Sequence, residues 1–232
     1  MARHLLSSSN NLWIKYVSIY VEVFSIALQK LSKRTSISGD EDAISERLSL
    51  LLNEVCFKLG KSRNQELPPP FWDAPNNPVN EEELKGGKIK KRPDFSCRLI
   101  NSMATSSEDY QISLHVECKR LGDPTSPTWI LNENYVKNGI KRFDSVEHEY
   151  GKRADSGMMI GYIIGMTPEK IESEVNEYQR KHLPEYMKIR FLFDRTSPFE
   201  TCQDIIRKNV LPTRFELIHL WVDLRHCYQR TD

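Results

Sequence analysis

The stretches PDFSCRLI (residues 93–100) and QISLHVECKR (residues 111–120) determine the architecture that we expect for this chain. Apolar and polar residues alternate in both stretches, which is the pattern of a half-buried β-strand. The ten residues between them, NSMATSSEDY, are mainly polar, as in the connection of a hairpin. We therefore predict two neighbouring strands, one at residues 94–100 and one at residues 111–120.

The second of these strands has one apolar and one polar face near its end. Successive side chains of a strand point to opposite faces, so Val116 and Cys118 share one face, and Glu117 and Lys119 share the other. Val116 and Cys118 suit a core, so we expect Glu117 and Lys119 to face a cleft. His115 lies on the same face as Glu117, where it has either a structural role or a role on the substrate side.

Two carboxylates and a lysine near one another suggest a particular chemistry. Asp94, at the start of the first strand, and Glu117 together can hold a hard cation such as Mg²⁺. A bound cation of this kind polarises a phosphodiester and lowers the pKa of its bound water. Lys119 can orient or deprotonate that water, or neutralise charge that develops on the phosphate.

These residues resemble the motif of the PD-(D/E)xK nuclease superfamily. Pro93 and Asp94 match its first part, 22 residues separate Asp94 from Glu117, and Glu117-Cys118-Lys119 match its second part. The resemblance implies a restriction-endonuclease-like fold, in which a mixed central sheet is flanked by helices and carries the motif on a central hairpin. It also implies that Asp94 and Glu117 bind Mg²⁺ or Mn²⁺ and that Lys119 is the catalytic lysine. More loosely, YVKNGIKRF followed by MMIGYII is similar to small nucleases of bacterial anti-phage defence.

The family often supplies a further acidic ligand from its first core helix, which we expect at residues 41–60 with Asp40 as N-cap and Gly60 at its end. At about 100° per residue, Glu41 points within the apolar face of this helix, whereas Glu46 points away from it. We therefore prefer Glu41 as a metal and catalytic residue. Glu54, near the edge of the same face, remains the alternative.

Residues 12–34 are expected to form a helix with two apolar faces. The stripe of Ile19, Val23 and Ile26 lies almost opposite the main one, so the helix is buried either in one large core or between its own domain and a partner subunit. Lys15 and Glu22 interrupt the apolar run at residues 12–28, which is also shorter than the roughly 20 residues of a membrane-spanning helix. We therefore expect no membrane segment.

The remaining pattern predicts a mixed α/β domain at residues 38–232 after an N-terminal helical extension at residues 1–37. We expect helices at residues 129–143 and 168–182, and further strands at residues 158–164, 189–193 and 215–224. His219, in the last of these strands, is expected to be a packed core histidine.

Basic residues are expected to bind the phosphates of a nucleic acid. They are Lys88, Lys90, Lys91 and Arg92, at a basic tip before Asp94, and Arg142, on the helix after the motif. The chain holds 33 Lys and Arg against 32 Asp and Glu, so a phosphate site has to be a local patch.

The composition favours a reduced, cytoplasmic setting. The five cysteines form no CxxC pair, and an odd number cannot pair completely within one chain. No P-loop, dinucleotide-binding, GxSxG or HExxH motif is present. We expect a metal-dependent DNA nuclease of a prokaryotic defence or restriction system, which forms a homo-oligomer or binds a partner such as an ATPase or sensor. The alternatives are a scaffold subunit that keeps the fold without catalysis, and an RNA nuclease.

Overall fold

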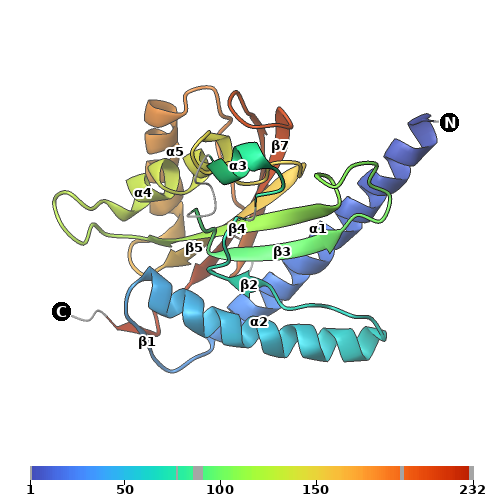
Figure 1. The fold of residues 1–232 in the computed structure, drawn as a ribbon. Helices are drawn as coiled ribbons and strands as arrows, with labels where there is room; N and C mark the ends of the chain where they lie inside the picture. Colours follow the sequence, from blue (N-terminus) through green and yellow to red (C-terminus); the bar gives the residue numbers. More distant parts are fainter. Residues whose placement is uncertain (1, 77, 86–90, 194–195, 230–232) are drawn as a thin grey trace.

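The fold was analysed in a computed structural model, which describes residues 2–76, 78–85, 91–193 and 196–229. A six-stranded mixed sheet forms its centre, with strand order β2-β3-β4-β5-β7-β6 (Figure 1). The strands of this sheet are β2 (Phe71–Trp72), β3 (Phe95–Ile100), β4 (Gln111–Leu121), β5 (Ser156–Ile163), β6 (Phe199–Ile206) and β7 (Arg214–Asp223). Strands β4, β5 and β7 are parallel to one another, and the other neighbours pair antiparallel.

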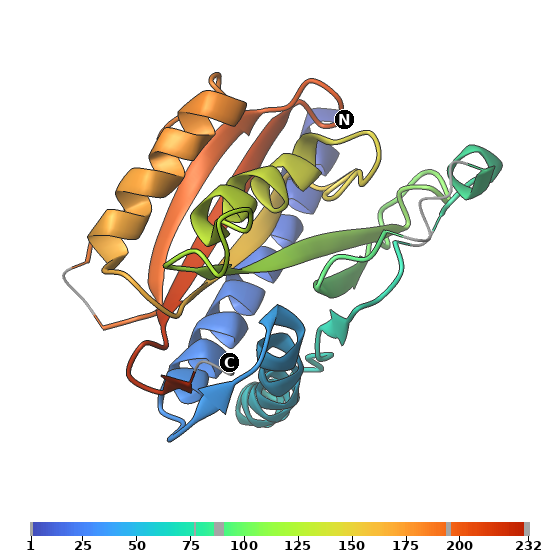
Figure 2. The ribbon, with the colours of Figure 1, turned by 90° about the vertical axis from the view of Figure 1, so that its left-hand side faces the viewer.

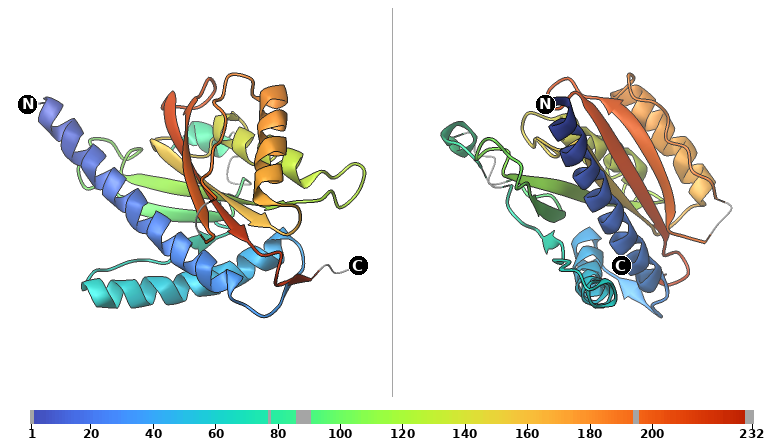
Figure 3. Two further views of the ribbon diagram at one scale, coloured as in Figure 1. Left: turned by 180° about the vertical axis from the view of Figure 1, so that it is seen from behind. Right: turned by 90° about the vertical axis from the view of Figure 1, so that its right-hand side faces the viewer.

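Helices cover both faces of this sheet (Figures 2 and 3). They are α1 (Ala2–Ser32), α2 (Glu41–Arg63), α3 (Glu81–Lys85), α4 (Leu131–Lys137), the 3₁₀ helix η2 (Ile140–Asp144) and α5 (Pro168–His182). One hydrophobic cluster joins the sheet to α1 and α2, and a second joins its other face to α4, η2 and α5. The predicted α/β class, with a mixed sheet flanked by helices, is thereby confirmed.

The predicted hairpin is present. Strands β3 and β4 pair antiparallel, with Phe95 opposite Val116 and Ile100 opposite Gln111. Val116 and Cys118 are fully buried in the cluster with α1 and α2, as their alternation predicts. Polar side chains of β4 therefore lie on the face that carries α4 and η2.

Helix α1 shares its core with the sheet. Its Trp13, Phe24 and Leu28 are buried in the same cluster as residues of β4, β5 and β7, so the boundary expected at residue 37 does not coincide with a break in the core. Val23 is fully buried within the chain itself, so at this position the structure matches the first of the two expectations, burial in one large core. The other two members of its stripe are partly buried against the same core.

The apolar segment of α1 is longer than the run expected at residues 12–28. The segment Leu12–Ser32 is long and apolar enough to span a membrane by length and composition, a test that core helices of soluble proteins also pass. Tyr20, Phe24 and Leu28 of this segment are completely or almost completely buried by the chain itself. The burial of these side chains identifies α1 as a core helix of the described fold.

Helix α2 begins as predicted and ends later. The Asp40 carboxylate accepts a hydrogen bond from the backbone N–H of Ala43 at 3.0 Å, which caps the first turn. The predicted end at Gly60 is wrong, because the helix continues to Arg63. Asn64 then adopts the left-handed conformation (φ 49°) that asparagine tolerates at a helix end.

The region after β4 differs from its prediction. The helix expected at residues 129–143 is divided into α4 and η2 at Asn138 and Gly139. Gly139 approaches α4 and β5 so closely that an added Cβ would lie 2.4 Å from the Tyr135 carbonyl oxygen and 2.5 Å from the Met159 methyl carbon. The tight contact with the sheet at this glycine accompanies the break.

The strand expected at residues 189–193 is absent from the described residues, and β6 at Phe199–Ile206 occupies the sheet edge instead. Side chains of α5 bind the backbone of this segment. Asn176 bonds both the N–H and the carbonyl of Ile189 at 2.8 Å, and Glu172 accepts from the N–H of Phe191 at 2.7 Å. Because these backbone groups are already paired, the segment is held in the core without joining the sheet.

Candidate active site

The β3–β4 hairpin brings Asp94, Glu117 and Lys119 together. Asp94 immediately precedes β3, and its Oδ2 accepts a hydrogen bond from the backbone N–H of Cys118 at 2.5 Å. Glu117 lies in the middle of β4 and is fully buried, and Lys119 follows on the same face. The structure therefore groups the three residues that the sequence motif singled out.

Helix α2 adds Glu41 from its first turn. The Lys119 ammonium donates to Glu41 Oε1 and to Glu117 Oε1, at 2.7 Å each. The other Glu41 oxygen accepts from the backbone N–H of Arg120 at 3.0 Å. Glu54, the alternative ligand, instead pairs with Lys30 and Lys58 away from the hairpin, so the geometry favours Glu41.

Arg142 enters the same group from η2. Its guanidinium forms an ion pair with Glu117 Oε1, the oxygen that also binds Lys119. The sequence suggested a contact between Arg142 and a nucleic-acid backbone, but its contact with Glu117 was not expected. Arg142 lies in η2, three residues after Gly139, where the helix is divided.

A cavity of about 360 Å³ opens beside these side chains. It is lined by Asp40, Glu41, Asp42, Lys119, Arg120, Trp129, Leu131, Asn134, Asn138 and Arg142. Trp129 is about half exposed at this cavity, where its ring can stack against a planar group. Sequence reasoning missed the Asn134–Asn138 pair, although a spacing of four residues on a helix places two amides on one face.

The charges in this group are strongly coupled. Burial and the neighbouring Glu117 carboxylate raise the pKa of Asp94 well above its ordinary value, and burial also raises the pKa of Glu117. Burial acts to lower the pKa of Lys119, but the surrounding carboxylates outweigh it and raise that pKa. Lys119 is therefore a permanent positive charge in this arrangement.

The side chains present fit a hard cation. Within the described residues no three His, Cys, Asp or Glu side chains converge on one point, but Mg²⁺ keeps several waters and needs only one or two carboxylates from a protein. Glu117 Oε2 is buried and has no hydrogen-bond partner. A buried carboxylate oxygen without a partner is costly unless a ligand satisfies it. Asp94 and Glu117 would hold such a cation, with Glu41 nearest to assist.

Of the basic tip, the structure describes Lys91 and Arg92, and neither lines this cavity. Lys88 and Lys90 lie outside the described residues. Lys91 forms an ion pair with Glu147, and Arg92 pairs with Asp73 at 2.9 Å. The structure therefore brings Arg142 to the site but leaves Lys91 and Arg92 engaged with surface carboxylates.

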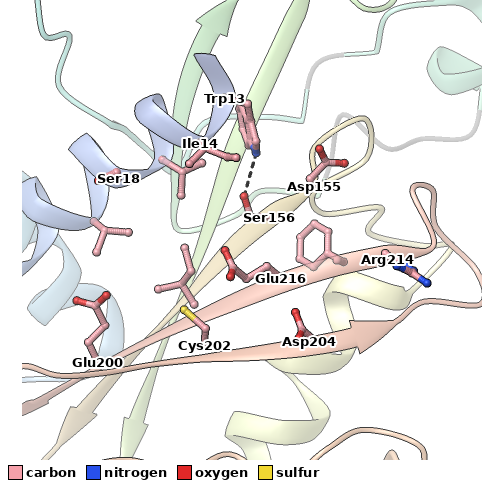
Figure 4. Close-up of a pocket in the computed structure, with 14 residues that line it drawn as sticks. Trp13, Ile14, Ser18, Asp155, Ser156, Glu200, Cys202, Asp204, Arg214 and Glu216 are labelled. Carbon is pink, nitrogen blue, oxygen red and sulfur yellow. Dashed lines mark hydrogen bonds between the residues drawn. The ribbon is translucent and has the colours of Figure 1, made fainter. Parts of the chain in front are cut away.

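A larger hollow of about 530 Å³ lies on the other side of the sheet, between α1 and strands β6 and β7 (Figure 4). At the edge of this hollow, the ring N–H of Trp13 donates a hydrogen bond to Ser156 Oγ at 2.9 Å. Four carboxylates line it, those of Asp155, Glu200, Asp204 and Glu216. Its negative charge makes it a poor phosphate site, and it contains none of the motif residues.

Searches with protein-family models, among curated proteins and among solved structures gave no significant match to this chain. The functional conclusion therefore depends on the geometry of Asp94, Glu117, Lys119, Glu41 and Arg142.

Proposed function

We propose that this chain is a metal-dependent DNA nuclease of the PD-(D/E)xK superfamily, with a restriction-endonuclease-like fold. One observation carries the proposal. Asp94, Glu117 and Lys119 lie together on one face of the β3–β4 hairpin, where a buried Glu117 oxygen has no partner. A cavity opens directly beside Lys119. This combination suits the binding of a cation and of a negatively charged phosphodiester.

Each side chain has a role in hydrolysis of the phosphodiester. Asp94 and Glu117 would hold Mg²⁺ or Mn²⁺, which would supply Lewis-acid activation of water and phosphate. Glu41 positions Lys119, whose ammonium stabilises negative charge that develops on the phosphate. Arg142 adds a second positive charge next to Glu117.

The raised pKa of Lys119 limits the roles that this residue can have in catalysis. An ammonium held by two carboxylates does not release its proton readily at neutral pH, so Lys119 acts through its charge. Orientation of the attacking water and neutralisation of the phosphate both fit this role. Proton abstraction by Lys119 does not fit it.

The second candidate is a scaffold subunit without catalysis, and the ion pairs favour it to a degree. Lys119 and Arg142 both bind one Glu117 oxygen, as structural ion-pair networks do. The unpaired second oxygen of Glu117 favours the nuclease. We also propose that the nuclease acts in the cytoplasm, within a prokaryotic defence or restriction system, together with an ATPase or sensor partner. RNA is the alternative substrate.

Cleavage of duplex DNA tests the proposal. The wild-type chain is expected to cleave with Mg²⁺ or Mn²⁺ and to bind without turnover in Ca²⁺, whereas a strong chelator abolishes cleavage. Glu117→Gln should remove both cleavage and metal affinity, which is measured by calorimetry. Glu54→Gln is the matched control because this glutamate pairs with two lysines outside the site. Cleavage that survives chelation, or a fully active Glu117→Gln, contradicts the proposal.

A further inference from the structure

A second hollow lies on the same face of the β3–β4 hairpin as the candidate site. It has a volume of about 340 Å³. Its lining includes Ser96, Arg98, Ser113, His115 and Arg153. None of its lining residues is a carboxylate and two are arginines, so the charge of this Arg98 hollow is opposite to that of the hollow between α1 and β6–β7.

Arg98 has no carboxylate partner among the described residues. Its guanidinium lies over the ring of Phe71, with 4.7 Å between the central carbon and the ring centre. A cation–π contact leaves the N–H groups at the edge of the guanidinium available to an acceptor. Arg153 donates to Glu83 at 2.5 Å through one nitrogen, so its charge is partly compensated. Arg98 therefore supplies most of the uncompensated positive charge.

His115 adds a hydrogen-bond donor to this hollow. Its side chain is 5% exposed, and its Nδ1 accepts a hydrogen bond from the backbone N–H of Gly151 at 3.1 Å. The ring proton therefore lies on Nε2, which has no partner among the described residues. Because His115 lines the hollow, its Nε2–H can donate to an acceptor that enters there.

The register links this hollow to the candidate site. Arg98 lies opposite Ser113, and Ser96 lies opposite His115. His115 is two residues before Glu117 on the same strand face, which is a distance of about 7 Å. The hydrogen-bond donors of the Arg98 hollow on β3 and β4 therefore lie next to the carboxylates of the candidate site on the same hairpin.

We propose that the Arg98 hollow binds a phosphate group of the DNA strand that enters the candidate site. The arginine charge, the His115 Nε2–H and the serine hydroxyls match the oxygens of a phosphate, and no lining carboxylate opposes it. The assignment of this phosphate to a DNA strand rests on the proposed nuclease function. A free phosphate or nucleotide has the same chemistry and is distinguished by the experiment.

The experiment measures binding of short duplex DNA in Ca²⁺ at several salt concentrations, together with calorimetry of inorganic phosphate. Arg98→Gln removes the charge, and Ser113→Asp places a carboxylate opposite Arg98 while the arginine remains. Arg34→Gln is the charge-matched control, because this exposed arginine follows α1 on the other side of the sheet. Thermal unfolding shows that each variant is folded.

Both hollow variants are expected to weaken DNA binding about tenfold. The slope of log affinity against log salt should fall by about 0.9, the value for one phosphate contact. At DNA concentrations below saturation, cleavage by both variants should slow in proportion to the lost affinity, and Arg34→Gln should match the wild type. Unchanged DNA affinity with lost binding of inorganic phosphate assigns the hollow to a free ligand and overturns the strand assignment. No change in either probe overturns the site altogether.

These outcomes separate the inference from the proposed function. If the wild type cleaves DNA with Mg²⁺ and the variants bind normally, only the phosphate site is wrong. If the wild type does not cleave DNA with any metal but Arg98 still controls phosphate binding, the nuclease proposal is wrong and the site stands.

Discussion

Two polar clusters are buried on the same face of the sheet, and their hydrogen bonding differs. In the neutral cluster, Trp221 donates to Tyr135 Oη (2.9 Å), Tyr135 pairs with His219 Nδ1 (2.7 Å), and His219 Nε2 pairs with Gln203 Oε1 (3.4 Å). Gln203 then donates to Gln179 (2.9 Å). The bonds can all run in one direction, so each donor meets an acceptor.

The charged cluster consists of Asp94, Glu117, Lys119, Glu41 and Arg142, and its groups are not all satisfied. One Glu117 oxygen accepts from two cations, whereas the other has no partner. Burial and the Glu117 carboxylate raise the pKa of Asp94, and burial raises the pKa of Glu117. Burial of polar groups alone therefore does not indicate function. An unbalanced cluster beside a cavity does, because it retains a capacity to bind.

The largest expected difference between the clusters concerns cleavage. Lys119→Met removes the ammonium but keeps an unbranched side chain, and it should lower the single-turnover rate by on the order of 10² to 10³. His219→Gln, in the neutral cluster, should leave the rate unchanged. Lys58→Met is the matched control, because Lys58 also pairs with a glutamate but is exposed. Cleavage by Lys119→Met at the wild-type rate would remove the catalytic role of this residue.

The second difference concerns the pH dependence of stability. Burial lowers the pKa of His219 to about 3 in the folded chain, against about 6.5 when unfolded. The unfolded state then binds more protons, so this stability is complete above about pH 6.5 and is lost as the pH falls toward 3. Between pH 6.5 and 5 the loss is about 2 kcal/mol.

Urea unfolding at each pH measures this contribution. His219→Gln should show a shallower decline in the free energy of unfolding below pH 6.5, and the exposed His226→Gln is its control. Equal slopes for the wild type and His219→Gln would show that the neutral cluster does not depend on an uncharged imidazole.

The smallest expected effect is a gain in stability. The pKa of Asp94 is raised in the folded chain, so at neutral pH the folded state carries the cost of its charge. Asp94→Asn keeps an oxygen for the Cys118 N–H and should raise the free energy of unfolding by about 1 kcal/mol while cleavage is lost. Asp109→Asn, at an exposed aspartate, is the control. If Asp94→Asn lowers the free energy of unfolding instead, the attraction of the Asp94 charge to Lys119 and Arg142 outweighs the cost of burying it.

Local patterns in the sequence were sufficient to predict the hairpin, its buried face and the grouping of Asp94, Glu117 and Lys119. Alternation has a period of two in a strand, so the faces of β4 follow from the order of its residues. The resemblance implies an acidic residue from the first core helix, and the angle between residues of a helix selects Glu41 for it. The N-cap at Asp40 follows from capping chemistry. These properties depend on neighbours in the chain and are therefore readable without the fold.

Only the tertiary structure placed Arg142 on Glu117, buried Val23 within the chain, kept residues 189–193 out of the sheet and formed the Arg98 hollow. Each depends on segments that are distant in sequence. The backbone at Ile189, for example, is paired by a side chain of α5. Hydrophobic patterning indicates that a residue is buried but not which segment buries it, because burial of apolar surface is non-directional. Packing among distant segments therefore determined these contacts, while the strand and helix periods determined the motif.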